Sequence, residues 1–241
     1  MLKISMLAGI LMSCAVTLAS TPSQADLDAG ERAQIQREIE SYIKANPEIL
    51  RDALMALAAR EEADRRRAGL MLVRDDAGDP VMGNPDGTVT IYEFSDYNCG
   101  YCKRMFGTVQ DLLKKNADLR MVLKEFPILS QSSLTAARAG IAAQKQGKFA
   151  PFHVAMMTHR GQVNDASIMK AAQEAEIDLA SFQRDMASDE TARIIERTRA
   201  AARALGLNGT PAFVIGDTII PGAVDAKQLQ AVIDDVRTKQ R

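Results

Sequence analysis

The residues of this chain best suited to chemistry are two cysteines that lie three positions apart. Cys99 and Cys102 enclose Gly-Tyr, and the 241 residues contain only one further cysteine, Cys14. The thiolate is the reactive form of cysteine, and unpaired N–H groups at the start of a helix stabilise such an anion. Because Cys99 follows a predicted strand and begins a predicted helix, we predict that it is the exposed nucleophile. Cys102, one turn further along, is predicted to be the shielded resolving thiol, which attacks a mixed disulfide held on Cys99.

Two other uses of the cysteine pair fit the sequence poorly. A disulfide between such near neighbours closes too short a loop to brace a fold, because the stabilisation grows with loop length. A zinc site needs two further ligands, and the only histidines, His153 and His159, fall in a predicted block of helices. We interpret both histidines as satisfied or solvent-facing residues, and we predict no metal site and no cofactor.

The first 25 residues have the pattern of a cleaved signal peptide. Lys3 precedes an apolar run over 4–19, and Ser23 and Ala25 form a small-x-small cleavage pattern. Export would place the protein in an oxidising compartment, where disulfides form and persist. Cleavage would also remove Cys14. Two alternatives stay open, namely an uncleaved anchor and lipid attachment at Cys14.

Composition and charge describe an ordinary globular protein. Hydrophobic residues make up 46% of the sequence and charged residues 25%, which is typical of a soluble domain. The net charge of -1 gives no reason to expect nucleic acid or an acidic membrane as a partner. The length allows one medium-sized domain with an accessory segment.

Residues 26–70 are predicted to form two helices. Asp28 and Glu31 have the spacing of a capping box, and Asn46 followed by Pro47 marks a second helix start. Apolar residues recur at helical spacing in both pieces. These apolar faces either pack back on the catalytic domain or pack on copies of the chain, and the spacing alone does not decide between the two.

The rest of the chain is predicted to be a linker over 71–88, rich in Gly, Pro and Asp, followed by an α/β domain over 89–241. The expected order is strand, helix, strand, a block of helices, hairpin and closing helix, which suits a domain with a helical insertion at about 134–205. The expected strands are 89–94, 119–126, 212–215 and 218–220, and the expected helices are 103–115, 135–146, 151–158, 166–175, 179–186, 189–205 and 226–239.

Three motifs carry a resemblance to a known family. The segments FSDYNCGYCK (94–103), KEFPIL (124–129) and GTPAF (209–213) together resemble the DsbA family of exported thioredoxin-like proteins, from roughly Gly83 to the C-terminus. The stretch IESYIKANPEILRDAL (39–54) further resembles the suppressor-of-copper-sensitivity protein ScsC and its relatives, some of which are trimers built through that segment. The resemblance implies a thioredoxin-like domain preceded by an N-terminal helical oligomerisation segment, and hence a homo-trimer.

The resemblance also implies roles for residues outside the cysteine pair. Thr210-Pro211 matches the cis-proline loop of the family, whose backbone pairs with substrate beside the disulfide. Glu93 matches the buried acid beneath the cysteines, which would relay a proton to or from Cys102. Lys124 is a weaker match, as a possible charge partner of Glu93.

The dipeptide between the cysteines indicates the direction of the chemistry. Strong oxidases of the family carry Pro-His there, whereas Gly100-Tyr101 and the Thr before the cis-proline are similar to the disulfide isomerases. We predict that these four residues, Gly100, Tyr101, Thr210 and Pro211, contact the substrate, and that the pair is a milder oxidant.

The sequence therefore predicts a periplasmic disulfide isomerase or reductase. Its substrates would be misoxidised proteins, and the resemblance implies a membrane-embedded thiol reductase that keeps Cys99 reduced. A monomeric dithiol oxidase stays open as an alternative. So does a Cu(I)-binding protein, because two thiolates suit Cu(I) and Met105 lies one helical turn from Cys102.

Overall fold

The computed structural model describes residues 27–240. The chain divides into two compact units, one ending at Leu57 and one beginning at Ala58. The predicted signal peptide over 1–25 and Cys14 lie outside the described residues. No helix between 27 and 240 combines the length and the apolar character needed to cross a membrane.

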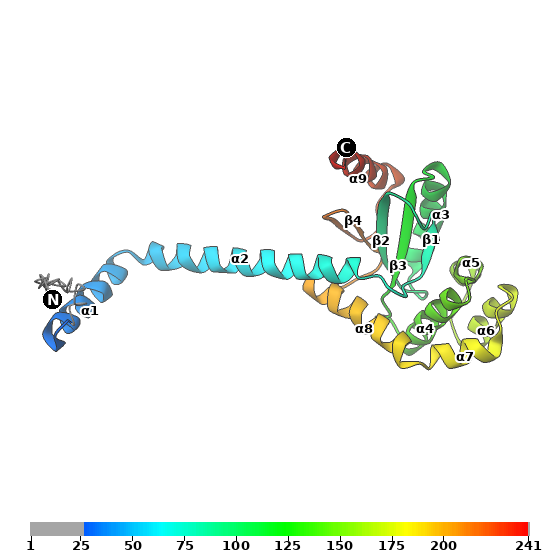
Figure 1. Cartoon of the computed structure of the whole chain (residues 1–241), viewed down its shortest axis with the longest axis horizontal. Coiled ribbons are helices and arrows are strands. Elements are labelled where there is room, and N and C mark those ends of the chain that lie inside the picture. Colours follow the sequence, from blue (N-terminus) through cyan, green and yellow to red (C-terminus); the bar gives the residue numbers. More distant parts are fainter. Residues whose placement is uncertain (1–26, 241) are drawn as a thin grey trace, which may run out of the picture. The chain divides into compact units, whose positions relative to one another are not determined.

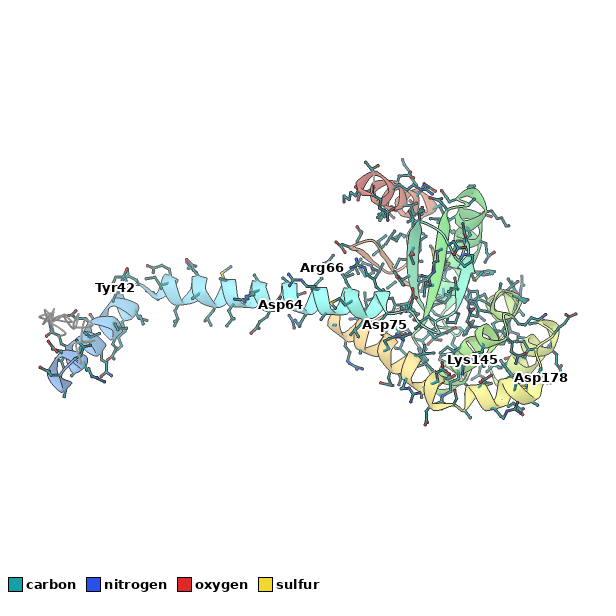
Figure 2. All side chains as sticks on the ribbon, in the orientation of Figure 1. Tyr42, Asp64, Arg66, Asp75, Lys145 and Asp178 are labelled. Atoms are coloured by element: carbon teal, nitrogen blue, oxygen red, sulfur yellow. The ribbon has the colours of Figure 1, made fainter. Side chains whose placement is uncertain are left out.

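Two helices begin where the sequence predicts them. Helix α1 (Ala29–Ala45) starts with a capping box, in which the Asp28 carboxylate accepts from the N–H of Glu31 at 2.8 Å and the Glu31 carboxylate accepts from the N–H of Asp28 at 2.9 Å. Helix α2 (Pro47–Arg74) begins at the predicted proline. No residue of α1 is buried, and it carries exposed apolar residues such as Tyr42, at 61% exposure (Figure 2).

The C-terminal end of α2 belongs to the packed domain. The helix continues to Arg74, beyond the predicted end of the helical segment at residue 70, and Leu70 and Val73 are buried. A Cβ atom on Gly69 would lie 2.5 Å from Cδ2 of Leu205, so the helix backbone closely approaches that side chain. Close packing of this kind requires glycine at the contact.

The predicted linker over 71–88 contains a strand as well as the last turn of α2. Strand β1 (Val81–Gly83) pairs antiparallel with β3 (Leu119–Glu125). Strand β1 was not predicted, because three residues are too few to show the alternation that marks a strand.

The five strands form one mixed sheet in the order β1-β3-β2-β4-β5 (Figure 1). Strand β2 (Val89–Ser95) lies at the centre, where it pairs parallel with β3 and antiparallel with β4 (Ala212–Ile215). Strand β5 (Thr218–Pro221) pairs with β4 across the predicted hairpin. Helix α3 (Gly100–Lys115) follows β2 directly, so the central strand delivers the cysteine pair to one end of the sheet.

The predicted α/β fold with a helical insertion is confirmed. The insertion consists of α4 (Gln131–Lys145), α5 (Phe149–Thr158), α6 (Asp165–Glu174), α7 (Leu179–Met186) and α8 (Asp189–Ala204), and α9 (Ala226–Lys239) closes the chain. Each predicted helix of the insertion is present, with ends that differ by at most four residues. The insertion packs on the cysteines, because one buried apolar cluster joins both of them to Phe152, Met156 and Phe182.

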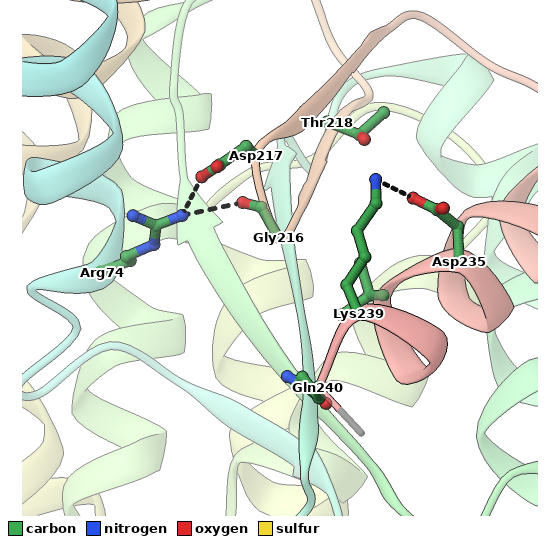
Figure 3. A pocket seen from close by; sticks show the side chains of 8 residues that line it. Arg74, Gly216, Asp217, Thr218, Asp235, Lys239 and Gln240 are labelled. Carbon is green, nitrogen blue, oxygen red and sulfur yellow. Dashed lines mark hydrogen bonds and ion pairs between the residues drawn. The ribbon is translucent and has the colours of Figure 1, made fainter.

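Two arginines attach the end of α2 to the tip of the β4–β5 hairpin. Arg66 donates to the carbonyl oxygen of Asp217 at 2.6 Å, and Arg74 donates to the carbonyl oxygen of Gly216 at 3.1 Å and pairs with the Asp217 carboxylate (Figures 2 and 3). A shallow pocket beside these bonds also borders the Lys239–Asp235 ion pair of α9. None of its lining residues is one of the predicted site residues.

Candidate active site

The two cysteines occupy different positions at the start of α3. Cys99 is the N-cap residue with an extended backbone, and its sulfur accepts from the N–H of Cys102 at 3.4 Å. Both thiols are free. Cys99 is 6% exposed and Cys102 is 0% exposed. The prediction that Cys99 is exposed was therefore too strong, because the chain around Thr210 covers it, although Cys99 remains the more accessible of the two.

The loop before β4 faces the Cys99 sulfur. The Thr210–Pro211 peptide bond is cis, as the resemblance implied. The Cys99 thiol donates to the carbonyl oxygen of Thr210 at 3.2 Å. A cavity of about 200 Å³ adjoins the loop, lined by residues 206–210 together with Ala212, Pro221 and Gly222. The Thr210 hydroxyl is buried with no partner among the residues that the structure describes.

Glu93 lies in the centre of the sheet, beneath the cysteines. It is buried on β2, and this burial raises its pKa to about 8, opposed by a hydrogen bond from Ser95. Burial also raises the pKa of the Cys102 thiol, and the charge of Glu93 adds to this effect. A hydrogen bond from Ser95 and one from the Asp96 backbone act in the opposite direction on Cys102. Glu93 and Cys102 are therefore electrostatically coupled.

Lys124 does not pair with Glu93, and that prediction was wrong. In the parallel register of β2 and β3, Lys124 lies beside Phe94, whereas Glu93 lies beside Leu123. Because side chains alternate along a strand, Lys124 and Glu93 point to opposite faces of the sheet. The Lys124 ammonium is buried and binds the Asp79 carboxylate at 2.6 Å.

A buried hydrogen-bonded group of Tyr97, Glu125 and His153 was not predicted. The Tyr97 hydroxyl lies 3.0 Å from Oε1 of Glu125 and 3.1 Å from Nδ1 of His153. Burial raises the pKa of Glu125 well above its ordinary value and lowers the pKa of His153 to about 3, so the imidazole is neutral at pH 7. The only sequence signal was that Tyr97 and Glu125 fall inside two of the family-like motifs. The satisfied role expected for His153 agrees with this bonding.

Asp96 holds the cysteine loop to the loop after β3. Its carbonyl oxygen accepts from the N–H of Cys99 at 2.9 Å. One carboxylate oxygen accepts from Asn98 N–H at 2.8 Å, and the other accepts from the N–H groups of Ile128 and Leu129 at 3.0 and 3.1 Å. These bonds fix the segment that carries Cys99, and sequence reasoning did not find them.

The dipeptide between the cysteines lies at the surface. Tyr101 is 60% exposed, and the Arg104 guanidinium lies 4.1 Å from its ring centre. Gly100 is also exposed. Met105, by contrast, is buried in the cluster that contains Val109 and Phe213, which is separate from the cluster around the cysteines. A core role for Met105 therefore fits this position better than a ligand role.

Comparisons with known proteins agree with this geometry. A thioredoxin family model matches residues 75–235, and the model of the N-terminal domain of the copper resistance protein ScsC matches residues 31–64. A thioredoxin-like oxidoreductase from Silicibacter pomeroyi is similar in structure, with 42% identity, a TM-score of 0.67, and coverage of 69% of this chain and 96% of that one.

Two further solved structures are similar over much of this chain. ScsC of Proteus mirabilis, in a transitional conformation, shares 29% identity with a TM-score of 0.66 and covers 90% of this chain and 100% of its own. A periplasmic thioredoxin-like protein from Salmonella enterica serovar Typhimurium shares 29% identity with a TM-score of 0.64 and covers 70% of this chain and 95% of its own.

A curated relative is much longer than this chain. The Na⁺/H⁺ antiporter NhaA of Herminiimonas arsenicoxydans is 29% identical over 193 residues, which are 78% of this chain and 31% of the antiporter. This chain thus matches less than a third of that relative. The family models and the solved structures, together with the cysteine pair on a thioredoxin-type sheet, establish the fold of a thiol-disulfide oxidoreductase. The chain therefore belongs to the thioredoxin family and carries at its N-terminus the domain that is typical of ScsC proteins.

Proposed function

We propose that this protein is a disulfide isomerase or reductase for misoxidised proteins. The observation that carries the proposal is the placement of Cys99 at the start of α3, with its sulfur 3.2 Å from the Thr210 carbonyl oxygen and Cys102 buried behind it. An anion at Cys99 is stabilised by the N–H of Cys102 and by the helix N-terminus. The buried Glu93, with its pKa of about 8, relays a proton to or from Cys102.

The reaction begins when the Cys99 thiolate attacks one sulfur of a substrate disulfide. A bond forms between Cys99 and that sulfur, the substrate S–S bond breaks, and the second substrate sulfur leaves with the electron pair. Attack on the mixed disulfide by another substrate thiolate releases Cys99 and completes isomerisation. Attack by Cys102 instead forms the Cys99–Cys102 disulfide and leaves the substrate reduced, after which a thiol reductase must supply two electrons. We propose that this reductase is membrane-embedded.

The proposal includes a homo-trimer formed through the N-terminal segment. The match of residues 31–64 to the ScsC N-terminal domain supports it, as does the exposure of apolar residues on α1 and the first part of α2. These residues are Ile35, Ile39, Tyr42, Ile43, Ile49, Leu50, Leu54 and Leu57. Exposed apolar residues in such number favour association. The predicted signal peptide, and the periplasmic relative from Salmonella, support a periplasmic location.

The test is recovery of activity from a substrate with scrambled disulfides. The chain from residue 26 onward is compared with the chain from Ala58 onward, which retains the whole packed unit including Leu70 and Val73. We expect the longer protein to reactivate the substrate and the shorter one to fail, while both reduce a small disulfide at equal rates. Loss of the reaction in a Cys99→Ser variant is the control. Failure of the longer protein to reactivate the substrate would contradict the isomerase role and favour the monomeric oxidase.

A Cu(I)-binding role is a second candidate, favoured by the match to a copper resistance protein. Two thiolates three residues apart suit Cu(I). Titration of the reduced protein with Cu(I), in competition with a chromogenic chelator, tests this role. Stoichiometric binding that Cys99→Ser and Cys102→Ser each abolish would support it, and no competition with the chelator would exclude it.

A further inference from the structure

Arg104 lies over the dipeptide that separates the two cysteines. Its guanidinium carbon is 4.1 Å from the ring centre of Tyr101, and a Cβ atom on Gly100 would lie 3.5 Å from Nη1 of Arg104. Tyr101 and Arg104 are three residues apart in α3 and are therefore neighbours on one face of the helix. Cys99 directly precedes this dipeptide as the N-cap residue of α3. The guanidinium is thus held next to the segment that carries the nucleophile.

The charge of Arg104 has no carboxylate partner among the residues that the structure describes. Asp111, the only acid within α3, pairs with Lys114 at 3.9 Å, further along the helix. Asp96, the acid closest before the cysteines, is buried, and its carboxylate accepts from three backbone N–H groups. Arg104 itself is exposed. Its charge is therefore available to an anionic group of an incoming molecule.

The local charge beside the cysteines differs in sign from the charge of the whole chain. The 241 residues carry a net charge of -1, which does not attract an acidic peptide. At the start of α3, by contrast, Lys103 and Arg104 are adjacent cations, and the first turn of the helix holds no acid. The Lys103 ammonium bonds the carbonyl oxygen of His159 at 2.8 Å, so Arg104 is the cation that faces the dipeptide. The group complementary to this surface is a carboxylate close to a substrate disulfide.

We propose that Arg104, held over the Tyr101 ring, is a specificity-determining residue that favours substrates with acidic side chains beside the disulfide. This inference rests on the proposed function, because a disulfide attacked by Cys99 must lie beside Gly100 and Tyr101. In that attack a bond forms between the Cys99 sulfur and one substrate sulfur, the substrate S–S bond breaks, and the other sulfur leaves with the electron pair. Arg104 takes no part in these bond changes. It attracts the substrate carboxylate during the approach and in the mixed disulfide.

The experiment compares the rates at which two peptides react with the reduced chain from residue 26 onward. Each peptide has one cysteine activated as a pyridyl disulfide, flanked by glutamates in one peptide and by glutamines in the other. Attack of Cys99 on the peptide sulfur releases thiopyridone, whose absorbance gives the second-order rate constant. We expect the glutamate peptide to react about threefold faster in about 0.1 M salt, as one screened charge pair near contact distance gives in water. In about 1 M salt this ratio should fall below about twofold.

Variants of the pair identify the group that sets the ratio. Arg104→Gln should lower the ratio to about one, Arg104→Glu should reverse it, and Arg104→Lys, which keeps the charge, should retain most of it. Tyr101→Ala, which removes the ring that holds the guanidinium, should lower the ratio to about two. Lys115→Gln is the matched control, because it removes an exposed positive charge at the other end of α3. That charge lies about 16 Å along the helix from Arg104, beyond the screening length of about 10 Å, so the ratio should not change.

Three results would overturn the role of Arg104 and leave the proposed function standing, because Cys99 still attacks in each. They are a wild type that does not distinguish the two peptides, a ratio that is the same in Arg104→Gln as in the wild type, and an equal slowing of both peptides in Arg104→Gln. The last result would show that Arg104 acts on the Cys99 thiolate rather than on the substrate. A reduced wild type that releases no thiopyridone from either peptide would overturn the proposed function, and the role of Arg104 with it.

Discussion

The burial of Glu93 has a measurable effect on stability, which replacement by glutamine should remove. The carboxyl lies in the middle of the sheet, and its pKa of about 8 compares with 4.5 for an ordinary glutamate. The folded protein therefore holds the proton more tightly than the unfolded chain does. A raised folded pKa means that the stabilisation is complete below about pH 4.5 and is lost as the pH rises towards 8.

The size of this loss follows from the two pKa values. Each pH unit between them costs about 1.4 kcal/mol of unfolding free energy, so the whole range amounts to about 5 kcal/mol. About 1 kcal/mol of this is lost by pH 5 and about 3 kcal/mol by pH 7. Glutamine has nearly the same shape as glutamate and carries no charge, so the stability of Glu93→Gln does not fall with pH through this group. The free energy of unfolding of Glu93→Gln should therefore exceed that of the wild type by an amount that grows with pH.

Urea unfolding of both proteins at pH 5, 7 and 9, with the thiols kept reduced, measures the difference. The advantage of Glu93→Gln should grow from about 1 kcal/mol to between 4 and 5 kcal/mol across this range. The contribution of Glu125 is common to both proteins and largely cancels. Glu174→Gln, at an exposed position, should give a pH-independent difference near zero. If the free energies of unfolding of the wild type and Glu93→Gln changed with pH in parallel, the assignment of a buried, protonated Glu93 would be refuted.

Three other predictions follow from buried contacts. Asp79→Ala should destabilise the protein by about 3–5 kcal/mol in thermal or urea unfolding, because it leaves the buried Lys124 ammonium without its carboxylate partner, whereas Asp75→Ala, with its exposed carboxylate, should cost less than about 1 kcal/mol. Gly140→Ala places a Cβ 2.3 Å from a Glu125 carboxylate oxygen and should destabilise by about 1–3 kcal/mol, while Gly107→Ala, with open space around it, should stabilise α3 by up to about 1 kcal/mol. The His153 ring, with its pKa near 3, should show no shift of its NMR resonances between pH 4.5 and 8. A shift in that range would show that water reaches the imidazole and that burial does not hold its pKa low.

Local signals in the sequence were sufficient for most of the secondary structure and for the cysteine pair. The caps at Asp28 and Asn46, the β-branched run at 89–94 and the turn at Gly216-Asp217 each act through neighbouring residues, and the helices and strands begin within a few residues of them. The family-like motifs located Cys99 and the cis bond before Pro211.

The contacts that the sequence could not give are those between distant segments. Tyr97 meets residues 28 and 56 positions away, and no periodicity joins them. Lys124 was assigned to the wrong partner because the face that a strand residue occupies depends on the register between β2 and β3, which only the folded sheet defines. The extension of α2 to Arg74 depends on burial of Leu70 and Val73 against the packed domain, which overrides the charged composition of the preceding turns.

The outermost strands of the sheet have a consequence for the proposed action on misoxidised proteins. Strand β1 has three residues, and β5 has four and ends at Pro221, which offers no N–H group. Long, open sheet edges act as templates for the pairing of other polypeptides, and short edges with proline prevent this. A partly unfolded substrate held on Cys99, as the proposed function requires, would therefore find little free strand edge on this sheet with which to pair. Under the proposed function, substrate contacts would be limited to the cysteine pair and the loop at Thr210-Pro211, and co-aggregation of the protein with its substrates would be disfavoured.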